Sequence, residues 1–571
     1  MRTSRFLLWA ALAFAALAAT LALARPPGAQ TSARPHGPGR ARLLGTTTAS
    51  ADVSFDLVLH LRERALDRYL SGLFDPHSPL YGRHLDPNAF GRRFGPSTGE
   101  LSALSVRLRA AGFRIVGTYP QRTSVRVRGS AAAVHGLLQI TLHDYLDPAG
   151  HRYHAPDRKP AIPHSLTRWV DTVAGLDTRS YGRMDYLPYG ALRPIDGQSA
   201  YDTLPLYQPK IGSFDGNGQT IALLSIDHFS QGDLDTFRSK FSLHSGPKVK
   251  TVVISNSGDT STGESNLDTQ VITAIAPRAQ IIDYQLAFPD LAQAINRIVS
   301  DRKATIVSGS FGMCDGTARD ANRNRVDPGF RTDVERALLA AASAGVSFFF
   351  STGDTGAFDC QRSDSTDRNV TAHFPSDAPY TVAVGGTVLS VGDDGSYQGE
   401  TGWDDTNTNG GGGGGLNPYD RRPPWQNSQQ VRVPGISNGN RQTPDVSAAA
   451  GTGSPWYVHN RGGWYQMWGT SASTPFWAAS MLIVQQYMLK KHAGPLCFAT
   501  PLLYALAERS WPFPPFHDIT VGDNRFYQTE PGWDFATGWG SPDVYNLATA
   551  AVAYRQRNPL PGNNACAGQI R

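Results

Sequence analysis

The sequence of 571 residues has only four cysteines, little charge and no run of basic residues. Charged residues make up 18% of the chain, Lys and Arg are scattered, and the formal net charge is +5. Binding of nucleic acid through a basic surface needs clustered positive charge, so the composition argues against that function. The hydrophobic share of 40% is typical of a soluble globular protein, and the length predicts more than one domain.

The N-terminus has the charge and apolar pattern of a targeting segment. Arg2 and Arg5 precede an apolar run over residues 6–24 that ends in small residues, so we predict a secretory signal at residues 1–24. The run is long for a signal, and an uncleaved membrane anchor is the alternative. Residues 25–50 are rich in Pro, Ala, Arg and Gly, which predicts a flexible lead-in.

Residues 51–166 alternate between strand and helix patterns. The run 53–61 alternates like a strand, and the stretch after it places Leu66 and Leu73 on one helical face. Mixed elements in a segment of this size predict an α+β domain with an antiparallel sheet, which an ordinary binding domain would also show. Residues 167–198 lack clear periodicity, so we interpret them as a linker.

Residues 199–571 predict an α/β domain with a mainly parallel sheet. Continuous apolar runs are typical of buried parallel strands, and helical stretches separate most of them. In such sheets, sites lie outside the carboxyl ends of the strands, and Asp354 directly follows one of the runs. The expected strands are residues 220–226, 251–254, 279–284, 305–310 and 346–351, and the expected helices are residues 269–275, 291–300 and 332–344.

Metal ligation by the cysteines is not indicated, because no close Cys/His pair occurs in the sequence. An even number of cysteines in an exported chain is typical of disulfides, and four allow three connectivities. Cys314 and Cys360 follow neighbouring strands on the side where the site is expected. We therefore favour a bond between these two, which leaves Cys497 and Cys566 as the second pair.

The sequence Gly469-Thr470-Ser471 introduces a helix that is apolar nearly all round, which predicts burial in a large core. Ser471 would lie near unpaired backbone donors and the positive end of the helix dipole, which suits an attacking oxygen and the oxyanion that it creates. The alternative is that Ser471 only caps the helix. We place Pro475 in the first turn, where its missing N–H costs nothing.

A nucleophilic serine needs a base, and the expected histidine motif is missing. The subtilisin-like enzymes share the Gly-Thr-Ser turn and carry His-Gly-Thr on an earlier helix, and that motif does not occur here. Where the helix is expected, Glu264 and Asp268 are spaced i, i+4, so both carboxylates project from one helical face. The alternative is a solvated acidic face.

Three motifs together resemble the sedolisins, the serine-carboxyl peptidases: Glu264-x-x-x-Asp268, the Gly-Asp-Thr-Gly around Asp354, and the Gly-Thr-Ser that ends at Ser471. Their order and wide spacing also match, and the resemblance covers residues 50–550. It implies that Ser471 attacks the peptide carbonyl, that Glu264 takes its proton and later protonates the leaving amine, and that Asp268 orients Glu264. It further implies that Asp354, as a neutral acid, donates a hydrogen bond in the oxyanion hole, where the alternative is a turn aspartate.

The N-terminal domain extends the resemblance. Residues 78–97 read SPLYGRHLDPNAFGRRFGPS, which is similar to the pattern SPxYGxxLTxxxFxxxFxPS of kumamolisin-type activation prodomains. The resemblance implies that residues 51–166 are a prodomain that inhibits its own peptidase domain. It also implies that the linker over residues 167–198 is cut during maturation.

The C-terminal region carries two aspartates among loop residues, Asp518 and Asp534. Carboxylate and carbonyl oxygens together make a site suited to Ca²⁺. The resemblance implies one structural Ca²⁺, bound by both aspartates and by the carbonyls of Ile519, Glu530 and Gly532. The family usually has Gly where Glu530 stands. The alternative is a pair of turn aspartates.

Residues 410–415 are six glycines, which predict a loop without a packing role. The loop is either a flexible spacer or a bare backbone that a peptide can approach closely. The chain also departs from many sedolisins at two positions, with Asp227 in place of Glu and Phe311 in place of Trp. His373 stands where some relatives place an acid that selects basic residues, so a preference for Lys or Arg is not indicated.

These features predict a secreted, acid-acting serine-carboxyl peptidase that hydrolyses peptide bonds in proteins and is made as a self-activating proenzyme. A carboxylate base with a pKa of about 4 stays available in acid, where histidine, with a pKa of about 6.5, is mostly protonated. A subtilisin-type serine peptidase is the alternative among enzymes, disfavoured by the missing histidine. A non-catalytic secreted binding protein on a peptidase scaffold is the alternative outside them, disfavoured because all four candidate catalytic residues are present. Endopeptidase and tripeptidyl-peptidase activity are not distinguished.

Overall fold

The computed structural model describes residues 41–146, 152–179, 191–243, 246–256, 259, 261, 263–315, 326–362, 365–405 and 409–561. The expected signal segment at residues 1–24 lies outside these ranges. Within them, no helix combines the length and the apolar character that a membrane crossing requires.

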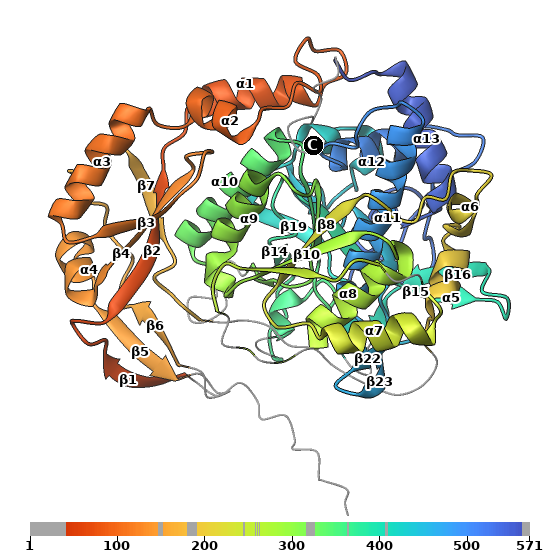
Figure 1. Ribbon diagram of the computed structural model, residues 1–571, viewed down its shortest axis with the longest axis horizontal. Helices are drawn as coiled ribbons and strands as arrows, with labels where there is room; N and C mark the ends of the chain where they lie inside the picture. Colours follow the sequence, from red (N-terminus) through yellow and green to blue (C-terminus); the bar gives the residue numbers. More distant parts are fainter. Residues whose placement is uncertain are drawn as a thin grey trace, which may run out of the picture. The chain divides into compact units, whose positions relative to one another are not determined.

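The N-terminal region is an α+β domain with antiparallel sheets, as the sequence predicts. Its elements, in chain order, are β1 (Arg42–Thr46), β2 (Asp52–Leu59), α1 (Glu63–Leu73), α2 (Pro87–Phe94), α3 (Thr98–Ala110), β3 (Arg114–Thr118), β4 (Ser124–Ser130), α4 (Ala131–Leu138), β5 (Leu142–Leu146), β6 (Arg152–Pro156) and β7 (Val170–Ala174). Four strands pair in the order β3-β4-β2-β7, and three more form a sheet in the order β1-β5-β6 (Figure 1). Helices α3 and α4 bury Leu108 and Val134 against Phe55 and Val127 of the larger sheet.

Two segments expected to be irregular are strands instead. Strand β1 falls in the expected lead-in over residues 25–50, and it pairs antiparallel with β5. Strand β7 falls in the expected linker over residues 167–198, and it pairs with β2, with Val173 opposite Leu57. The sequence pattern misses both strands for one physical reason: pairing with a distant strand fixes a short segment whose own sequence has no clear period.

The C-terminal region, residues 199–571, contains an eight-stranded sheet in which only β16 runs antiparallel to its neighbour, which confirms the expected α/β fold with a mainly parallel sheet. Its strands are β8 (Thr220–Ser225), β9 (Lys250–Val253), β10 (Gln280–Gln285), β11 (Ile306–Gly309), β13 (Ser347–Ser351), β15 (Val382–Val391), β16 (Tyr397–Gly402) and β21 (Val446–Ala449). The order is β16-β15-β13-β11-β8-β10-β9, and β21 pairs with β15.

Helices cover both faces of this sheet (Figure 1). On one face, α8 (Gly263–Ile275), α11 (Thr470–Lys490) and α13 (Val544–Arg557) enclose a core to which β8 contributes Ile221 and Leu223. On the other face, α9 (Leu291–Asp301) and α10 (Pro328–Ser343) pack on Ala222 and Leu224 of the same strand. Because β8 is buried on both faces, its sequence is a continuous apolar run.

Smaller elements complete the region. They are α5 (Pro194–Ala200), α6 (Leu204–Tyr207), α7 (Gln231–Lys240), α12 (Thr500–Ala507), β12 (Met313–Cys314), β14 (His373–Phe374), β17 (Asp404–Asp405), β18 (Gly410–Gly411), β19 (Gly415–Arg421), β20 (Asn440–Thr443), β22 (Trp456–Asn460), β23 (Gly463–Met467), β24 (Phe516–His517), β25 (Ser541–Pro542) and the 3-10 turns η1 (Phe288–Asp290), η2 (Asp359–Arg362), η3 (Pro424–Gln426) and η4 (Gln429–Val431).

The glycine run is packed, contrary to the expectation of a loop without a packing role. A Cβ atom on Gly413 would lie 1.7 Å from the carbonyl oxygen of Thr352, and one on Gly414 would lie 2.0 Å from that of Phe535. No side chain fits at either position, so glycine is required here by close approach of backbones.

The favoured disulfide between Cys314 and Cys360 is confirmed, with an S–S distance of 2.09 Å. It joins β12 to η2 near the carboxyl ends of β11 and β13. The second expected pair includes Cys566, which lies outside the described residues, so that pairing stays a prediction.

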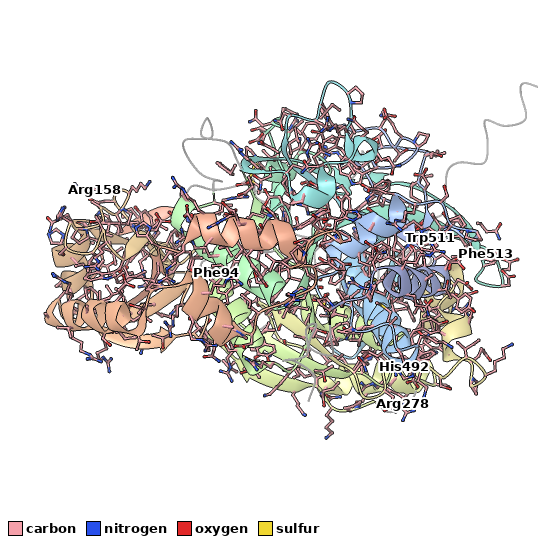
Figure 2. All side chains as sticks on the ribbon, turned by 90° about the horizontal axis from the view of Figure 1, so that it is seen from above. Phe94, Arg158, Arg278, His492, Trp511 and Phe513 are labelled. Atoms are coloured by element: carbon pink, nitrogen blue, oxygen red, sulfur yellow. A yellow bond between two sulfur atoms is a disulfide. The ribbon has the colours of Figure 1, made fainter. Side chains whose placement is uncertain are left out.

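The N-terminal domain meets the C-terminal region along α10. Arg336 of α10 forms ion pairs with Asp171 at 2.6 Å and with Glu63 at 3.5 Å. Phe94 of α2, labelled in Figure 2, belongs to an apolar cluster that also contains Ala340 of α10. The contact therefore combines charged and apolar groups.

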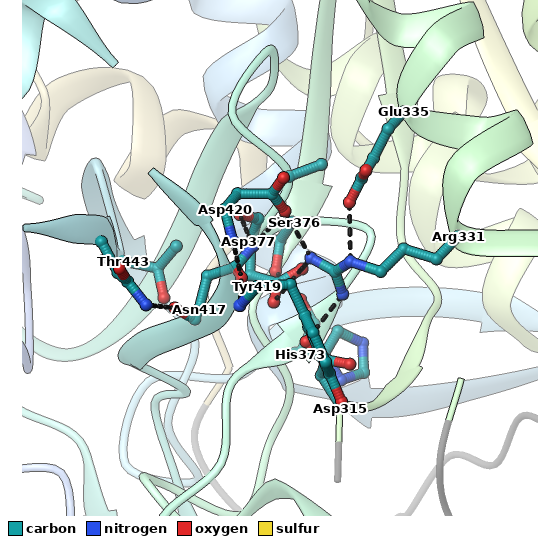
Figure 3. Close-up of polar contacts among 12 residues, drawn as sticks. Asp315, Arg331, Glu335, His373, Ser376, Asp377, Asn417, Tyr419, Asp420 and Thr443 are labelled. Carbon is teal, nitrogen blue, oxygen red and sulfur yellow. Dashed lines mark hydrogen bonds and ion pairs between the residues drawn. The ribbon is translucent and has the colours of Figure 1, made fainter. Parts of the chain in front are cut away.

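A buried cluster of acids surrounds Arg331 of α10, and we call it the Arg331 cluster (Figure 3). The guanidinium lies within ion-pair distance of Glu335 at 2.6 Å, Asp315 at 2.7 Å, Asp420 at 2.9 Å and Asp377 at 3.5 Å. Four carboxyl groups thus share one positive charge. The cluster ties α10 to the segments that follow β12 and β14 and to strand β19 itself.

Candidate active site

The candidate catalytic side chains meet at the carboxyl ends of the parallel strands, where α/β sheets hold their sites. Asp227, Ser310 and Asp354 stand just beyond β8, β11 and β13. Together with Glu264 and Ser471 they line a cavity of about 260 Å³. The fold therefore brings together residues that are far apart in the sequence.

Helix α8 presents Glu264 from its first turn. The carboxylate of Asp227 accepts hydrogen bonds from the backbone N–H groups of Glu264 at 3.1 Å and Ser265 at 3.0 Å, and from the Ser265 hydroxyl. A carboxylate at a helix N-terminus pairs donors that lack helical partners and is favoured by the dipole. Asp227 therefore fixes the start of α8 and the direction of Glu264, while burial raises the pKa of Asp227 to about 6.

The carboxyl group of Glu264 is buried among other acids. Its Oε1 atom has no hydrogen-bond partner among the described residues. Burial, and then the charges of Asp268 and Asp227, raise the pKa of Glu264 well above its usual range, while a hydrogen bond with the Ser471 hydroxyl opposes the rise. A carboxyl group with an unpaired oxygen beside a serine hydroxyl can accept the proton that the hydroxyl loses on attack.

Asp268 lies one turn further along α8 and is 1% exposed. The Ser310 hydroxyl is 2.7 Å from Oδ1 of Asp268 and donates a hydrogen bond to it. Burial raises the pKa of Asp268 well above its usual range, and the bond from Ser310 lowers it. The acidic face of α8 is turned to the interior, so the alternative of a solvated acidic face is wrong.

Ser471 is the second residue of α11 and not its N-cap, so the capping alternative is wrong. The residue before the helix is Gly469, whose φ of +114° favours glycine. A Cβ atom there would also lie 2.8 Å from Oδ2 of Asp354. Ser471 is 8% exposed, and its hydroxyl lies 3.4 Å from the carbonyl oxygen of Ser310.

Pro475 lies inside α11, so its expected place in the first turn is wrong. A residue with an N–H at this position would donate to the carbonyl of Ser471, four residues earlier. Instead, the Ser310 hydroxyl lies 3.2 Å from that carbonyl oxygen. The proline leaves the carbonyl of Ser471 open to a donor from another element.

Asp354 is held by the start of α11. Its Oδ1 atom accepts hydrogen bonds from the backbone N–H of Thr470 at 2.7 Å and from the Thr470 hydroxyl at 2.8 Å. Arg362 approaches the other oxygen, with Nη1 3.9 Å from Oδ2. Sequence reasoning missed Arg362, because it stands in η2 outside any motif.

Two family models match the chain: the pro-kumamolisin activation domain over residues 40–179, and the subtilase family over residues 252–540. Sedolisin from Pseudomonas sp. (strain 101) is 29% identical over 524 residues, which cover 86% of this chain and 85% of that protein. Kumamolisin from Bacillus sp. (strain MN-32) is 30% identical over 511 residues, which cover 84% of this chain and 87% of that protein. The chain belongs to the sedolisin family.

A solved structure, of Pseudomonas sedolisin (serine-carboxyl proteinase) complexed with two molecules of pseudo-iodotyrostatin, is 28% identical with a TM-score of 0.53. The match covers 66% of this chain and 100% of the sedolisin chain. The sedolisin-family protein described here is therefore a serine-type peptidase with an activation domain in front of it. The activation-domain match runs past β7, in agreement with the pairing of β7 in the N-terminal sheet.

The cavity of this sedolisin-family peptidase also contains a histidine. Nδ1 of His373 is 2.8 Å from Oδ2 of Asp359, and both side chains are 2% exposed. A Cβ atom on Gly312 would lie 2.3 Å from Nε2 of His373, so the far side of the ring packs on the Gly312 backbone. No hydrogen bond joins His373 to Ser471 in the part of the chain that the structure describes.

The five residues implied as calcium ligands lie in one region of loops. Oδ2 of Asp518 accepts a hydrogen bond from the N–H of Gly532 at 2.9 Å, and Oδ2 of Asp534 accepts one from the N–H of Glu530 at 3.0 Å. No hydrogen bond reaches the carbonyl oxygens of the three residues named as carbonyl ligands, within the described ranges. These residues are Ile519, Glu530 and Gly532.

The donor set of this region fits a hard cation. Burial raises the pKa of Asp534 to about 7 and also raises the pKa of Asp518. The described residues contain no group of three or more His, Cys, Asp or Glu placed to hold a metal. A site here would therefore depend on backbone carbonyls as well as carboxylates, which is a ligand set that Ca²⁺ accepts.

Proposed function

We propose that this peptidase is a secreted, acid-acting serine-carboxyl peptidase that hydrolyses peptide bonds in proteins. One observation carries the proposal: Ser471 and Glu264 line the same cavity, and the Oε1 atom of Glu264 is buried there without a hydrogen-bond partner among the described residues. Ser471 attacks the peptide carbonyl, Glu264 takes its proton and later gives it to the leaving amine, and Asp268 orients Glu264.

The electrostatics of the carboxyl pair support this division of roles. Glu264 and Asp268 raise each other's cost of ionisation, because two like charges at short range cannot both form readily. The pair therefore holds one proton and one negative charge between its two apparent pKa values. In that state Glu264 is an acceptor for the Ser471 proton, and no imidazole that acid would protonate takes part.

Asp354 serves as the donor to the oxyanion. Thr470 donates two hydrogen bonds to its Oδ1 atom, which leaves Oδ2 as the oxygen to face the developing negative charge and to donate to it when it carries a proton. Arg362 stands 3.9 Å from the same oxygen and adds positive charge to this side of the cavity. Both groups act most strongly in the transition state.

The proposal includes one structural Ca²⁺. The residues that would hold it are the side chains of Asp518 and Asp534 and the carbonyls of Ile519, Glu530 and Gly532. Support comes from the two carboxyl groups, which lie in one loop region, and from the three carbonyl oxygens, which accept no hydrogen bond from the residues that the structure describes. When bound, the ion supplies positive charge that links loop segments, and it takes no part in the reaction.

The activation domain acts as an intramolecular inhibitor, and the linker after β7 is cut on maturation. The ion pairs of Arg336 with Asp171 and Glu63 support docking of the two domains near neutral pH. Acid protonates the carboxylates, removes those pairs and weakens the docking. The targeting pattern at residues 1–24 supports secretion.

Digestion of casein at pH 3–5, about the carboxylate range, tests the function. Wild type, Ser471→Ala, Glu264→Ala and His373→Ala are matured by a separate protease and compared, with circular dichroism as the check on folding. We expect wild type and His373→Ala to cleave, and the other two to lose about 10³-fold or more.

Each alternative function has its own outcome in this experiment. Loss of activity in His373→Ala with retention in Glu264→Ala would assign the base to histidine, as in a subtilisin-type peptidase. A folded and matured wild type that cleaves nothing at any pH would favour a binding protein on a peptidase scaffold. Sequencing of the products separates endopeptidase from tripeptidyl-peptidase cleavage.

A further inference from the structure

We propose that Ser310 is a positioning residue of the catalytic centre, whose hydroxyl joins the Asp268 carboxyl group to the backbone carbonyl of the nucleophile Ser471. The inference rests on the proposed roles of Glu264, Asp268 and Ser471. It assigns a task to a side chain at the end of β11 that the proposed mechanism does not otherwise use.

Ser310 and Ser471 contact each other twice, each time through the hydroxyl of one serine and the backbone carbonyl of the other. The Ser310 hydroxyl oxygen is 3.2 Å from the Ser471 carbonyl oxygen, and the Ser471 hydroxyl oxygen is 3.4 Å from the Ser310 carbonyl oxygen. Ser310 is 4% exposed, so water does not compete for these contacts. The start of α11 is thereby held against the end of β11, with the reactive hydroxyl between them.

The acceptor on α11 is available because of Pro475. Without an N–H at that position, the Ser471 carbonyl has no donor from the following turn of its own helix. A buried carbonyl without a donor costs free energy, and the Ser310 hydroxyl is the group placed to supply one. The same hydroxyl lies 2.7 Å from Oδ1 of Asp268.

A hydroxyl group has one hydrogen to donate and can also accept. When Asp268 is ionised, the Ser310 hydrogen is directed to its Oδ1 atom. When Asp268 carries a proton, the carboxyl group can donate to the Ser310 oxygen, which frees the Ser310 hydrogen for the Ser471 carbonyl. The hydroxyl therefore couples the charge of the carboxyl pair to the backbone of the nucleophile.

The surroundings make this donor important, because the charged groups that act on the pair are mostly acids. Burial first, and then Asp227 and Asp283, raise the pKa of Asp268, and the Ser310 hydrogen bond opposes them. Besides the two acids of α8, the groups that act on the pair are Asp227 beyond β8, Asp283 on β10 and Asp354 beyond β13. The cavity that Glu264 lines also contains Asp259, Arg362, His373 and Arg461.

The test compares Ser310→Ala, Ser310→Thr and a matched control, Ser473→Ala. Ser473 is another buried hydroxyl in the first turns of α11, and it donates to the carbonyls of Gly385 at 2.7 Å and Thr470 at 3.0 Å without touching the carboxyl pair. Matured enzymes are assayed from pH 2 to pH 7 on a quenched peptide copied from a casein site that the wild type cleaves. Thermal unfolding of each variant reports its stability.

In Ser310→Ala we expect kcat to fall about ten-fold with little change in KM, and the acid limb of the kcat profile to move up by about one pH unit, the size of a hydrogen bond to a charged group. Ser310→Thr keeps the hydroxyl and should return the limb to the wild-type position. Ser473→Ala should change thermal stability and leave the limb where it is.

An unmoved acid limb in Ser310→Ala, or an equal displacement in Ser473→Ala, would overturn the inference. A displaced limb that Ser310→Thr does not restore would also overturn it, provided that Ser310→Thr keeps the wild-type circular dichroism spectrum. Glu264→Ala, run in parallel, distinguishes failure of the role of Ser310 from failure of the proposed function. If Glu264→Ala is inactive and Ser310→Ala matches the wild type, only the role of Ser310 fails, whereas an active Glu264→Ala refutes the proposed function and with it the role of Ser310.

Discussion

The Arg331 cluster predicts that Asp315→Asn stabilises the protein at neutral pH. Four carboxyl groups surround one guanidinium, so full ionisation would set four negative charges against one positive charge. Burial and the neighbouring Asp377 raise the pKa of Asp315 to about 10, and Arg331 opposes them. Asparagine keeps an acceptor for Arg331 and replaces the acid proton toward Asp377 with an N–H, so it mimics the protonated state.

Linkage sets the sign and the size of the effect. The pKa of Asp315 is higher in the folded protein than in the unfolded chain, where it is about 3.9. Below the pKa of the unfolded chain, about 3.9, the protonated group contributes its full share to the free energy of unfolding. That contribution is lost as the pH rises toward about 10, the pKa in the folded protein. The loss is about 1.4 kcal/mol per pH unit for one proton. Asp315→Asn should therefore match the wild type at pH 4 and exceed it by roughly 2–4 kcal/mol at pH 7.

Urea unfolding at pH 4 and pH 7 measures this difference, in a Ser471→Ala background that prevents self-digestion. Asp445→Asn is the matched control, because Asp445 is also buried but pairs one-to-one with Arg441 at 2.6 Å. The amide there breaks a balanced pair and should destabilise the protein at both pH values. An Asp315→Asn protein that is no more stable than its parent at pH 7 would show that Asp315 is ionised in the fold, and would refute the reasoning.

Three further predictions follow from the proposed site and domain contact. Chelation at neutral pH should lower the Tm of the mature domain, and Asp518→Ala should abolish the effect; purified protein without calcium and with an unchanged Tm would contradict the calcium site. Arg336→Ala should speed maturation after an acid shift, because it removes both ion pairs to the activation domain, whereas the Ser471→Ala precursor should stay uncut by N-terminal sequencing. Asp354→Asn should lower kcat about 10²-fold and leave KM within a few-fold, and an equal change in both would argue against an oxyanion role.

The strands of the peptidase sheet could be predicted because burial on both faces leaves a continuous apolar run, as in β8. The strands β1 and β7 could not, because each owes its structure to a partner strand far away in the sequence. The glycine run was misjudged for a related reason. Its composition indicates flexibility, and only the approach of Thr352 to Gly413 shows that the position is closely packed.

The candidate site divides in the same way. Glu264, Asp354 and Ser471 stand in motifs whose chemistry can be recognised from residue type and spacing. Ser310 and Arg362 carry no such signal, since a serine at a strand end and an arginine in a short turn are common. Their importance depends on contacts across the fold, such as the bond from Ser310 to a carboxyl group 42 residues earlier.

Pro475 combines a signal that the sequence shows with a contact that only the fold reveals. Proline in a helix interior removes one hydrogen bond and costs about 3 kcal/mol, so sequence reasoning placed it where it would cost least. The fold puts it inside α11 instead, and the acceptor that it leaves unpaired is the carbonyl of Ser471. That carbonyl lies 3.2 Å from the Ser310 hydroxyl, which also contacts Asp268. A local violation of helix preference thus coincides with the place where Ser471, the end of β11 and the carboxyl pair are joined, as expected where function competes with stability.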